Sequence, residues 1–345
     1  MMRIEKSVFG KTGSGVEIEQ YEFFAGDIKA RVMTFGSVLI GIDVPDKTGK
    51  YHDVTLGYDS LDDYINDKFY FGAIIGRYAG RIRRGHFRLN EKDYFLTRNN
   101  GSNHLHGGNS GFSKNVWHAE PFSSADKIGV KLNYQSKSGE EGYPGDLSCQ
   151  IIYTLSSDNS LSIKYIAKCT EPTPVNLANH SYFNLSEQGN ILQHSLKLYA
   201  DKYLPADDEL LPTGEILSVK GTSFDFSSER VLKHAIKETE NGFDNTFVIN
   251  NGSGRLKLAA VLKSPDTGIV MEVLTTKPGI HLYTGNFLDS TVIGKNGKAL
   301  SKFGGLCLED QHFPDSPNIE HFPSTILLPG EVYMHETVYK FYREN

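Results

Sequence analysis

Apolar and polar residues alternate with a period of two over much of the chain. The clearest stretches are residues 147–155 and 161–169, in which every second residue is apolar. Such alternation is typical of strands that bury one face in an antiparallel sheet. Residues 156–160 form a turn cluster between these stretches, and the same order of strand, turn and strand recurs over 256–275. Both places therefore predict antiparallel hairpins.

Helical periodicity is limited to two short segments. Apolar residues within 231–236 predict a short helix with Ser228 as its N-cap, and residues 61–65 predict one or two helical turns. The alternation of strands and helices that builds a nucleotide-binding sheet is absent, and no Pro/Ser-rich linker divides the chain. We therefore predict an all-β fold in which residues 1–345 form a single domain, a large antiparallel β-sandwich with one or two short helices.

The charge balance argues against one class of partner. The 345 residues include 36 Lys and Arg against 42 Asp and Glu, a formal net charge of −6 at pH 7. Because there is no basic excess to neutralise phosphates, we expect no nucleic-acid partner. The first residues are charged where a signal peptide needs an apolar core, and no run of about 18 apolar residues occurs. We therefore expect a cytoplasmic location and no membrane partner, although a chain trimmed of its signal would look the same.

The cysteines favour a reducing compartment. Cys149, Cys169 and Cys307 are odd in number, widely spaced and without a C-x-x-C pair. Cys149 and Cys169 lie on the apolar faces of their predicted strands, so we expect small buried hydrophobic side chains rather than reactive thiols.

Candidate chemistry is concentrated in three polar segments, residues 99–108, 174–185 and 305–311. Each places a His or a Glu beside short apolar stretches, where partial desolvation moves pKa values toward neutrality, as acid–base catalysis requires. Taken singly, each residue is better explained as a hydrogen-bonded histidine or a surface carboxylate, and it is the three segments together that favour catalysis. His104 and His106 could also share a strand face and bind a metal. No carboxylate follows at the short spacing that such a site uses, so a metal is the less favoured interpretation.

Eight motifs occur in order along the chain: GRYAGRI (76–82), NHLHGG (103–108), EEGYPG (140–145), NHSYFNL (179–185), LPTGEI (211–216), GFDN (242–245), YTGNF (283–287) and LEDQ (308–311). One such motif is weak evidence, but eight in order are specific. With them the chain resembles the aldose 1-epimerase, or galactose mutarotase, family from Phe9 to Glu331. The resemblance implies a β-supersandwich that interconverts the α and β anomers of free aldohexoses, such as galactose or glucose, without a cofactor or metal.

The resemblance also implies roles for individual residues. Glu309 matches the base that removes the proton of the C1 hydroxyl, and His180 matches the acid that protonates the ring oxygen. Both residue types suit proton transfer near neutral pH. His106, Arg81 and Asp244 match residues that bind the sugar.

Five further positions complete this assignment. Tyr182 follows His180 by two residues and is expected to line the same pocket. Gly80 stands where many members carry Asn, and His281 stands where many carry Gln, so both departures bear on sugar preference. Arg77 is expected, like His104, to play a supporting role.

Three alternatives to an epimerase of free aldohexoses remain at this stage. A non-catalytic carbohydrate-binding sandwich could keep Arg81 and Asp244 but would not need both His180 and Glu309. A hexose-6-phosphate epimerase would need clustered arginines, for which the crowded Arg77, Arg81, Arg83 and Arg84 are candidates. A glycoside hydrolase would need two paired carboxylates rather than a His with a Glu. The favoured partner is a small-molecule sugar, bound by a monomer or weak homodimer.

Overall fold

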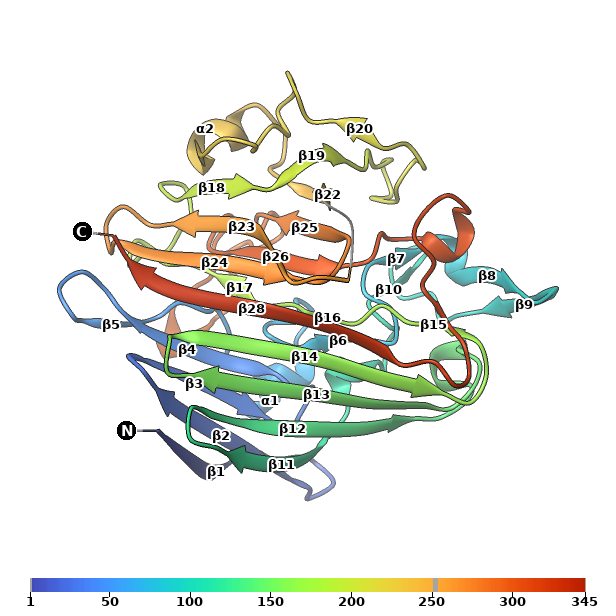
Figure 1. Cartoon of the computed structure of the whole chain (residues 1–345), viewed down its shortest axis with the longest axis horizontal. Helices are drawn as coiled ribbons and strands as arrows, with labels where there is room; N and C mark the ends of the chain where they lie inside the picture. Colours follow the sequence, from blue (N-terminus) through green and yellow to red (C-terminus); the bar gives the residue numbers. More distant parts are fainter. Residues whose placement is uncertain (1, 251–253, 345) are drawn as a thin grey trace.

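The computed structural model describes residues 2–250 and 254–344, and strands dominate it (Figure 1). Within these residues the strands form three large antiparallel sheets and four two-stranded pairs. The same part of the chain contains two short α-helices, neither of them long and apolar enough to span a membrane. The prediction of an all-β fold with one or two short helices is confirmed.

One sheet, here called the large sheet, runs in the order β11-β12-β13-β14-β28-β24-β23-β18-β21. The predicted hairpins are confirmed, because β13 pairs with β14 and β23 pairs with β24. Its strands are β11 (His118–Ser123), β12 (Lys127–Ser136), β13 (Leu147–Ser156), β14 (Ser160–Cys169), β28 (Tyr333–Arg343), β24 (Ile269–Thr275), β23 (Lys257–Lys263), β18 (Ser195–Leu198) and β21 (Arg230–Val231).

Two other sheets are called here the N-terminal sheet and the site sheet. The N-terminal sheet consists, in order, of β1 (Arg3–Lys11), β2 (Glu17–Ala25), β3 (Ile28–Met33), β4 (Leu39–Pro45) and β5 (Tyr51–Asp53). The site sheet consists, in order, of β17 (Tyr182–Phe183), β26 (Leu306–Gln311), β25 (Gly279–Tyr283), β22 (Asp244–Ile249), β19 (Ala200–Tyr203) and β20 (Leu217–Ser218).

Short elements connect the three sheets. The two-stranded pairs are β6 (Ile74–Ile75) with β16 (Ala178–Asn179), β7 (Arg81–Ile82) with β10 (His104–Leu105), β8 (His86–Leu89) with β9 (Lys92–Phe95), and β15 (Thr173–Pro174) with β27 (Ile326–Leu327). Single 3-10 turns occur at η1 (Arg83–Gly85), η2 (Phe112–Lys114), η3 (Glu140–Gly142), η4 (Lys295–Gly297) and η5 (Ser316–Asn318).

One continuous hydrophobic core joins the three large sheets. Phe23 of the N-terminal sheet, Ile151 and Ile163 of the large sheet, and Ile280 and Leu308 of the site sheet belong to one cluster of buried side chains. Burying each such side chain contributes roughly 1.5–3 kcal/mol. The large sheet is therefore one layer of a sandwich whose other layer is shared by the N-terminal sheet and the site sheet.

The helix predictions are confirmed in one case and corrected in the other. Helix α1 (Leu61–Asn66) begins where the sequence predicts a helix, and the Oγ of Ser60 caps it by accepting a hydrogen bond from the Asp63 N–H at 3.2 Å. Helix α2 (Leu232–Lys237) has Val231 at its N-cap position, so the prediction of Ser228 is wrong. The reason is that β21 pairs with β18, which keeps the backbone extended until residue 231.

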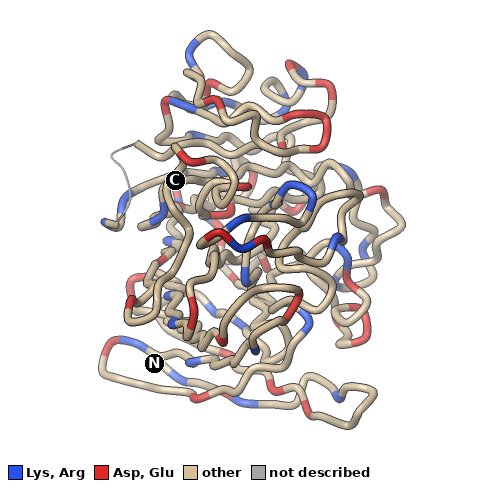
Figure 2. The backbone as a smooth tube through the Cα atoms, turned by 90° about the vertical axis from the view of Figure 1, so that its right-hand side faces the viewer, with Lys and Arg blue, Asp and Glu red and all other residues tan. Residues whose placement is uncertain are grey.

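Two expectations about side-chain environment have different outcomes. Cys149 is buried as predicted, whereas Cys169 is only half-buried and its Sγ donates a hydrogen bond to the Leu327 carbonyl at 3.3 Å. Cys169 is the last residue of β14, where the sandwich interior gives way to the surface. Figure 2 shows acidic and basic residues interspersed along the chain, in keeping with its small net charge.

A tight turn after β10 brings His106 to its place. Gly107 has a φ of +85°, and a Cβ atom there would lie 1.8 Å from the carbonyl oxygen of Gly76. Only glycine allows two backbone segments to approach this closely.

Replacing Gly107 by Ala should destabilise the protein through both the backbone conformation and the overlap with Gly76. Gly139 is a matched control, because its φ is +87° and a Cβ there meets nothing within 4 Å. Gly139→Ala should therefore cost only the backbone component, about 1–2 kcal/mol. Gly107→Ala should lower the free energy of unfolding by clearly more, as measured by urea denaturation. Equal losses in the two variants would contradict this account of the turn.

Two buried histidines are held in the neutral form. Burial lowers the pKa of His194 to about 4 and, together with the charge of Lys277, the pKa of His312 to about 3. The Nε2 of His194 accepts a hydrogen bond from the Leu185 N–H at 2.9 Å, which requires that nitrogen to be unprotonated. In the unfolded chain both residues take up a proton near pH 6.5.

Acid should therefore weaken the fold, because below about pH 6.5 the unfolded state binds protons that folded His194 does not bind until about pH 4. The free energy of unfolding should fall in this window by up to about 1.4 kcal/mol per pH unit for each such histidine. His194→Asn should give a shallower pH dependence than the parent chain in urea titrations followed by circular dichroism. The exposed His118 supplies the control, and His118→Asn should leave the slope unchanged. A His194→Asn slope as steep as the parent's would refute the assignment.

Candidate active site

The site sheet presents one face of β26 to a cavity and the other face to the core. Side chains alternate along a strand, so Cys307, Glu309 and Gln311 share one face. Leu306 and Leu308, on the opposite face, belong to the main core. Across the neighbouring strands, Glu309 pairs with His281 of β25, and Tyr283 of β25 pairs with Asp244 of β22. Three strands thus bring these polar side chains to the same surface.

His180 lies between β16 and β17 rather than within a strand. Its backbone N–H donates to the Ala73 carbonyl at 2.9 Å, and its carbonyl accepts from the Gly72 N–H at 3.0 Å. Its Nδ1 lies 3.6 Å from the Sγ of Cys307. These contacts fix the imidazole at the edge of β26, beside Glu309.

Arg81 and His106 reach the cavity from the opposite wall, where β7 pairs with β10. The His106 N–H donates to the Gly80 carbonyl at 3.1 Å, and the Gly80 N–H donates to the Nδ1 of His106 at 3.2 Å. The Nε of Arg81 donates to the Oδ1 of Asn100 at 3.1 Å. Both side chains are therefore oriented by neighbours on their own wall.

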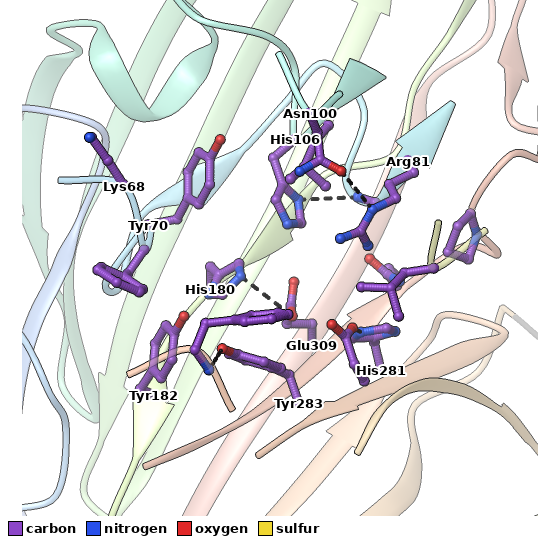
Figure 3. A pocket seen from close by; sticks show the side chains of 18 residues that line it. Lys68, Tyr70, Arg81, Asn100, His106, His180, Tyr182, His281, Tyr283 and Glu309 are labelled. Atoms are coloured by element: carbon purple, nitrogen blue, oxygen red, sulfur yellow. Dashed lines mark hydrogen bonds and ion pairs between the residues drawn. The ribbon is translucent and has the colours of Figure 1, made fainter. Parts of the chain in front are cut away.

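All seven site residues expected from the sequence line one cavity of about 220 Å³ (Figure 3). They come from positions 81 to 309 of the chain and converge only in the folded structure. The members of this set are Arg81, His106, His180, Tyr182, Asp244, His281 and Glu309.

The centre of the cavity holds a histidine facing a carboxylate. The Nε2 of His180 lies 3.6 Å from the Oε1 of Glu309, and both residues are buried, with 5% and 2% exposure. This separation exceeds a normal hydrogen bond, so each group remains available to a substrate oxygen placed against both. A proton donor and a proton acceptor in this arrangement can act as general acid and general base.

His106 adds a neutral hydrogen-bond donor. Burial lowers the pKa of His106 well below its ordinary value, and the neighbouring His180 and Arg81 act in the same direction. Because its Nδ1 accepts the Gly80 N–H, the single proton of the neutral imidazole lies on Nε2. His106 can therefore donate a hydrogen bond from Nε2 while its imidazole remains neutral.

Asp244 and His281 form a hydrogen-bonded pair on the floor of the cavity. The Nε2 of His281 donates to the Oδ1 of Asp244 at 2.8 Å, and its Nδ1 lies 2.9 Å from the Oγ1 of Thr246. Burial by itself would raise the pKa of Asp244. The hydrogen bond from His281 and the nearby charge of Arg81 outweigh burial and bring this pKa below its ordinary value. An ionised Asp244 can accept hydrogen bonds from sugar hydroxyls.

The metal-binding interpretation of His104 with His106 is wrong. The Nδ1 of His104 donates to the Thr97 carbonyl at 2.6 Å, and its Nε2 accepts from the Tyr143 hydroxyl at 2.8 Å, so neither nitrogen is free for a metal. Ligand atoms of His106, His180 and Glu309 do lie within 4.8 Å of one another. A metal on His106, however, would need its Nε2 without a proton, which the bond from Gly80 to Nδ1 disfavours.

The supporting residues lie outside the cavity. Arg77 is buried behind it and donates to the Ser136 Oγ at 2.7 Å, the Pro144 carbonyl at 2.9 Å and the Lys137 carbonyl at 2.8 Å. Arg83 bonds instead to Asp207 at 2.9 Å. Of the four crowded arginines in this region, Arg81 is the one that lines the cavity.

Sequence reasoning missed part of the cavity wall. The ring of Tyr70 lies 5.0 Å from the ring of His106 and 5.8 Å from that of His180, and so covers both imidazoles. Lys68, Phe69 and Phe287 also line the cavity. Phe287 belongs to one of the recognised motifs, whereas residues 68–70 lie in none of them and follow no periodic pattern.

Comparison with known proteins gives consistent matches over the whole chain. The sequence profile of the family described as aldose 1-epimerase matches residues 19–340. A galactose mutarotase from Bos taurus is 43% identical over 345 residues, which cover 99% of each chain. An aldose 1-epimerase from Escherichia coli strain K12 is 35% identical and covers 91% of this chain and 92% of that protein.

Solved structures agree with the sequence matches. The structure of a GalM/aldose epimerase homologue from C. elegans has a TM-score of 0.86 at 34% identity and covers 92% of this chain and 96% of that chain. The structure of a galactose 1-epimerase from Lactobacillus acidophilus has a TM-score of 0.88 at 26% identity over the full length of both chains. Profile, sequence and structure thus converge, and the chain belongs to the aldose 1-epimerase family.

Proposed function

We propose that this chain interconverts the α and β anomers of a free aldohexose, with Glu309 as base and His180 as acid. The observation that carries this proposal is the pair of buried side chains facing each other 3.6 Å apart in the cavity. Names of similar proteins, galactose mutarotase and aldose 1-epimerase, support the same reaction.

Each catalytic group has one task in the ring-opening step. Glu309 accepts the proton of the C1 hydroxyl as His180 donates a proton to the ring oxygen, and the bond between C1 and that oxygen breaks. Rotation about the C1–C2 bond then presents the other face of the aldehyde, and the two residues exchange roles as the ring closes. The Nε2 proton of His106 stabilises negative charge near the ring oxygen without entering the proton transfer.

Two polar groups bind the other hydroxyls. Asp244, held by His281, accepts hydroxyl hydrogens, and Arg81 donates to hydroxyl oxygens. A neutral sugar is favoured over a hexose 6-phosphate, because Arg77 and Arg83 bond to protein groups away from the cavity. A non-catalytic sugar-binding protein is disfavoured, because it has no need of an acid facing a base.

We extend this proposal to the setting in which the protein works. The site residues span positions 81 to 309, which supports one domain over residues 1–345. The three free cysteines suit a reducing, cytoplasmic compartment, and the interspersed charges suit a protein without nucleic-acid or membrane partners. The protein is taken to act as a monomer or weak homodimer.

The purified protein should speed the approach of freshly dissolved α-D-glucose or α-D-galactose to its equilibrium optical rotation, measured in a polarimeter. Glu309→Gln and His180→Asn should each lower kcat by about 10²–10⁴-fold, because each removes one partner of the proton transfer. Glu120→Gln is the control, since Glu120 is 59% exposed on β11, and it should be as active as the parent. A parent trace no faster than buffer would refute the reaction for these sugars. Full activity of either active-site variant would refute its assigned role.

Activity should be unchanged by metal chelators, because proton transfer between Glu309, His180 and the sugar needs no metal. The measurement is the polarimetric rate before and after treatment with EDTA and dialysis. Loss of activity that is restored by adding a divalent cation would instead assign His106, His180 and Glu309 to a metal centre.

A further inference from the structure

A second ionisable pair lies directly behind the proposed base. Asp310 follows Glu309 in β26 and therefore points away from the cavity, toward the interior of the sandwich. Its Oδ2 lies 3.0 Å from the Nζ of Lys277, and both side chains are fully buried, with 0% exposure. Removing two charges from water is costly, so a buried pair of this kind needs close geometry and further hydrogen bonds to be tolerated.

The Lys277 ammonium uses its hydrogen bonds to join the two catalytic segments. It donates to the Oδ2 and, at 3.1 Å, to the carbonyl of Asp310, the residue after the base Glu309. It also donates to the carbonyl of Leu177, three residues before the acid His180. An ammonium has three N–H donors, so these three bonds use all of them.

The surrounding residues hold this ammonium in place. Lys277 follows β24, and its backbone N–H donates to the Oγ1 of Thr275 at 3.1 Å. The same hydroxyl donates to the Oδ2 of Asp310 at 3.0 Å. On the other side, the Nζ lies 3.9 Å from the centre of the Tyr165 ring, which favours a cation.

Lys277 is also the positive charge beside two consecutive carboxylates. Burial lowers the pKa of Lys277, whereas the charges of Asp310 and Glu309 both act to raise it. The other titratable groups that face the pair from β14, β28 and the segment after β26 are Tyr165, His312, Tyr333, His335 and Tyr339. Burial, with Lys277, lowers the pKa of His312 to about 3 and that of His335 to about 2, so neither histidine carries charge near pH 7.

We propose that Lys277 is a positioning residue for the acid–base pair: its ammonium holds the Leu177–His180 segment against β26 and is the counter-ion of Asp310, the residue next to Glu309. This inference rests on the proposed roles of Glu309 and His180. Without Lys277, the carboxylate of Asp310 would lose its counter-ion, and its negative charge would lie one residue from Glu309 in the same strand.

The test compares Lys277→Gln, Asp310→Asn and the double variant in full kinetics across pH. Lys277→Gln should lower kcat by about tenfold to a hundredfold with little change in KM, because it misplaces reacting groups without removing a sugar contact. The acidic limb of kcat/KM should move up by about one pH unit in Lys277→Gln and down by about one unit in Asp310→Asn. The double variant has two uncharged amides in place of the ion pair, so its acidic limb should lie at nearly the same pH as that of the parent.

Lys295 provides the matched control. Its Nζ lies 2.8 Å from the Oδ2 of Asp53, and its side chain is only 12% exposed, but it does not line the catalytic cavity. Lys295→Gln removes a comparable ion pair and should leave the pH limb in place, even if the melting temperature falls. If Lys277→Gln does not fold, the downward shift in Asp310→Asn carries the test alone.

Two results overturn the inference. One is that the acidic limb of kcat/KM lies at the same pH in Lys277→Gln and Asp310→Asn as in the control Lys295→Gln. The other is that this acidic limb moves by the same amount and in the same direction in Lys277→Gln and in Asp310→Asn. Failure of the proposed function is seen separately, as full activity in Glu309→Gln, whatever the Lys277 variants do.

Discussion

The antiparallel pairing of β25 with β26 is the interaction on which the site depends. It sets Glu309 opposite His281 and Cys307 opposite Tyr283. Because strand side chains alternate, a slip of one residue would turn Glu309 into the core and bring Asp310 into the cavity. The slip is unfavourable because it would remove Asp310 from its partners Lys277 and Thr275, which are buried on the core side of the strand. Two consecutive acidic residues thus have different tasks that follow from the face each one occupies.

The rest of the sandwich supports this register from both sides. The face of β26 that carries Leu306 and Leu308 is continuous with the core of the large sheet, so the strand cannot shift without exposing apolar surface. His180, the proposed acid, lies on irregular backbone between β16 and β17, which is held by individual hydrogen bonds rather than by a long strand ladder. His180 is fixed by Gly72 and Ala73, which come from a part of the chain more than a hundred residues earlier. His180 and Glu309, the proposed acid and base, therefore meet only when distant segments have docked.

Much of the fold was predictable because its signals are local. Alternation over residues 147–169 predicts the β13–β14 hairpin without reference to any other part of the chain, and the ordered motifs contain six of the seven expected cavity residues, all except His281. Other features depend on tertiary contacts. The start of α2 is delayed by pairing between β21 and β18, which no pattern around Ser228 reveals. Tyr70 reaches the cavity through the path of its loop, and Lys277 meets Asp310 across 33 positions in sequence. Each is decided by packing in three dimensions, where sequence periodicity carries no information.

The two walls of the cavity differ in construction. Glu309, His281 and Asp244 lie on neighbouring strands of five or six residues in the site sheet, whereas Arg81 and His106 depend on β7 and β10, which have two residues each. A two-residue pair depends on its flanking turns, such as the close approach of Gly107 to Gly76, whereas the longer strands are held by their own ladders of hydrogen bonds. On the proposed roles, the sugar contacts are divided between the two walls. An exchange at Arg81 can change which sugar is admitted without altering a strand of the site sheet, whereas Asp244 and His281 share the constraints of the sheet that carries Glu309.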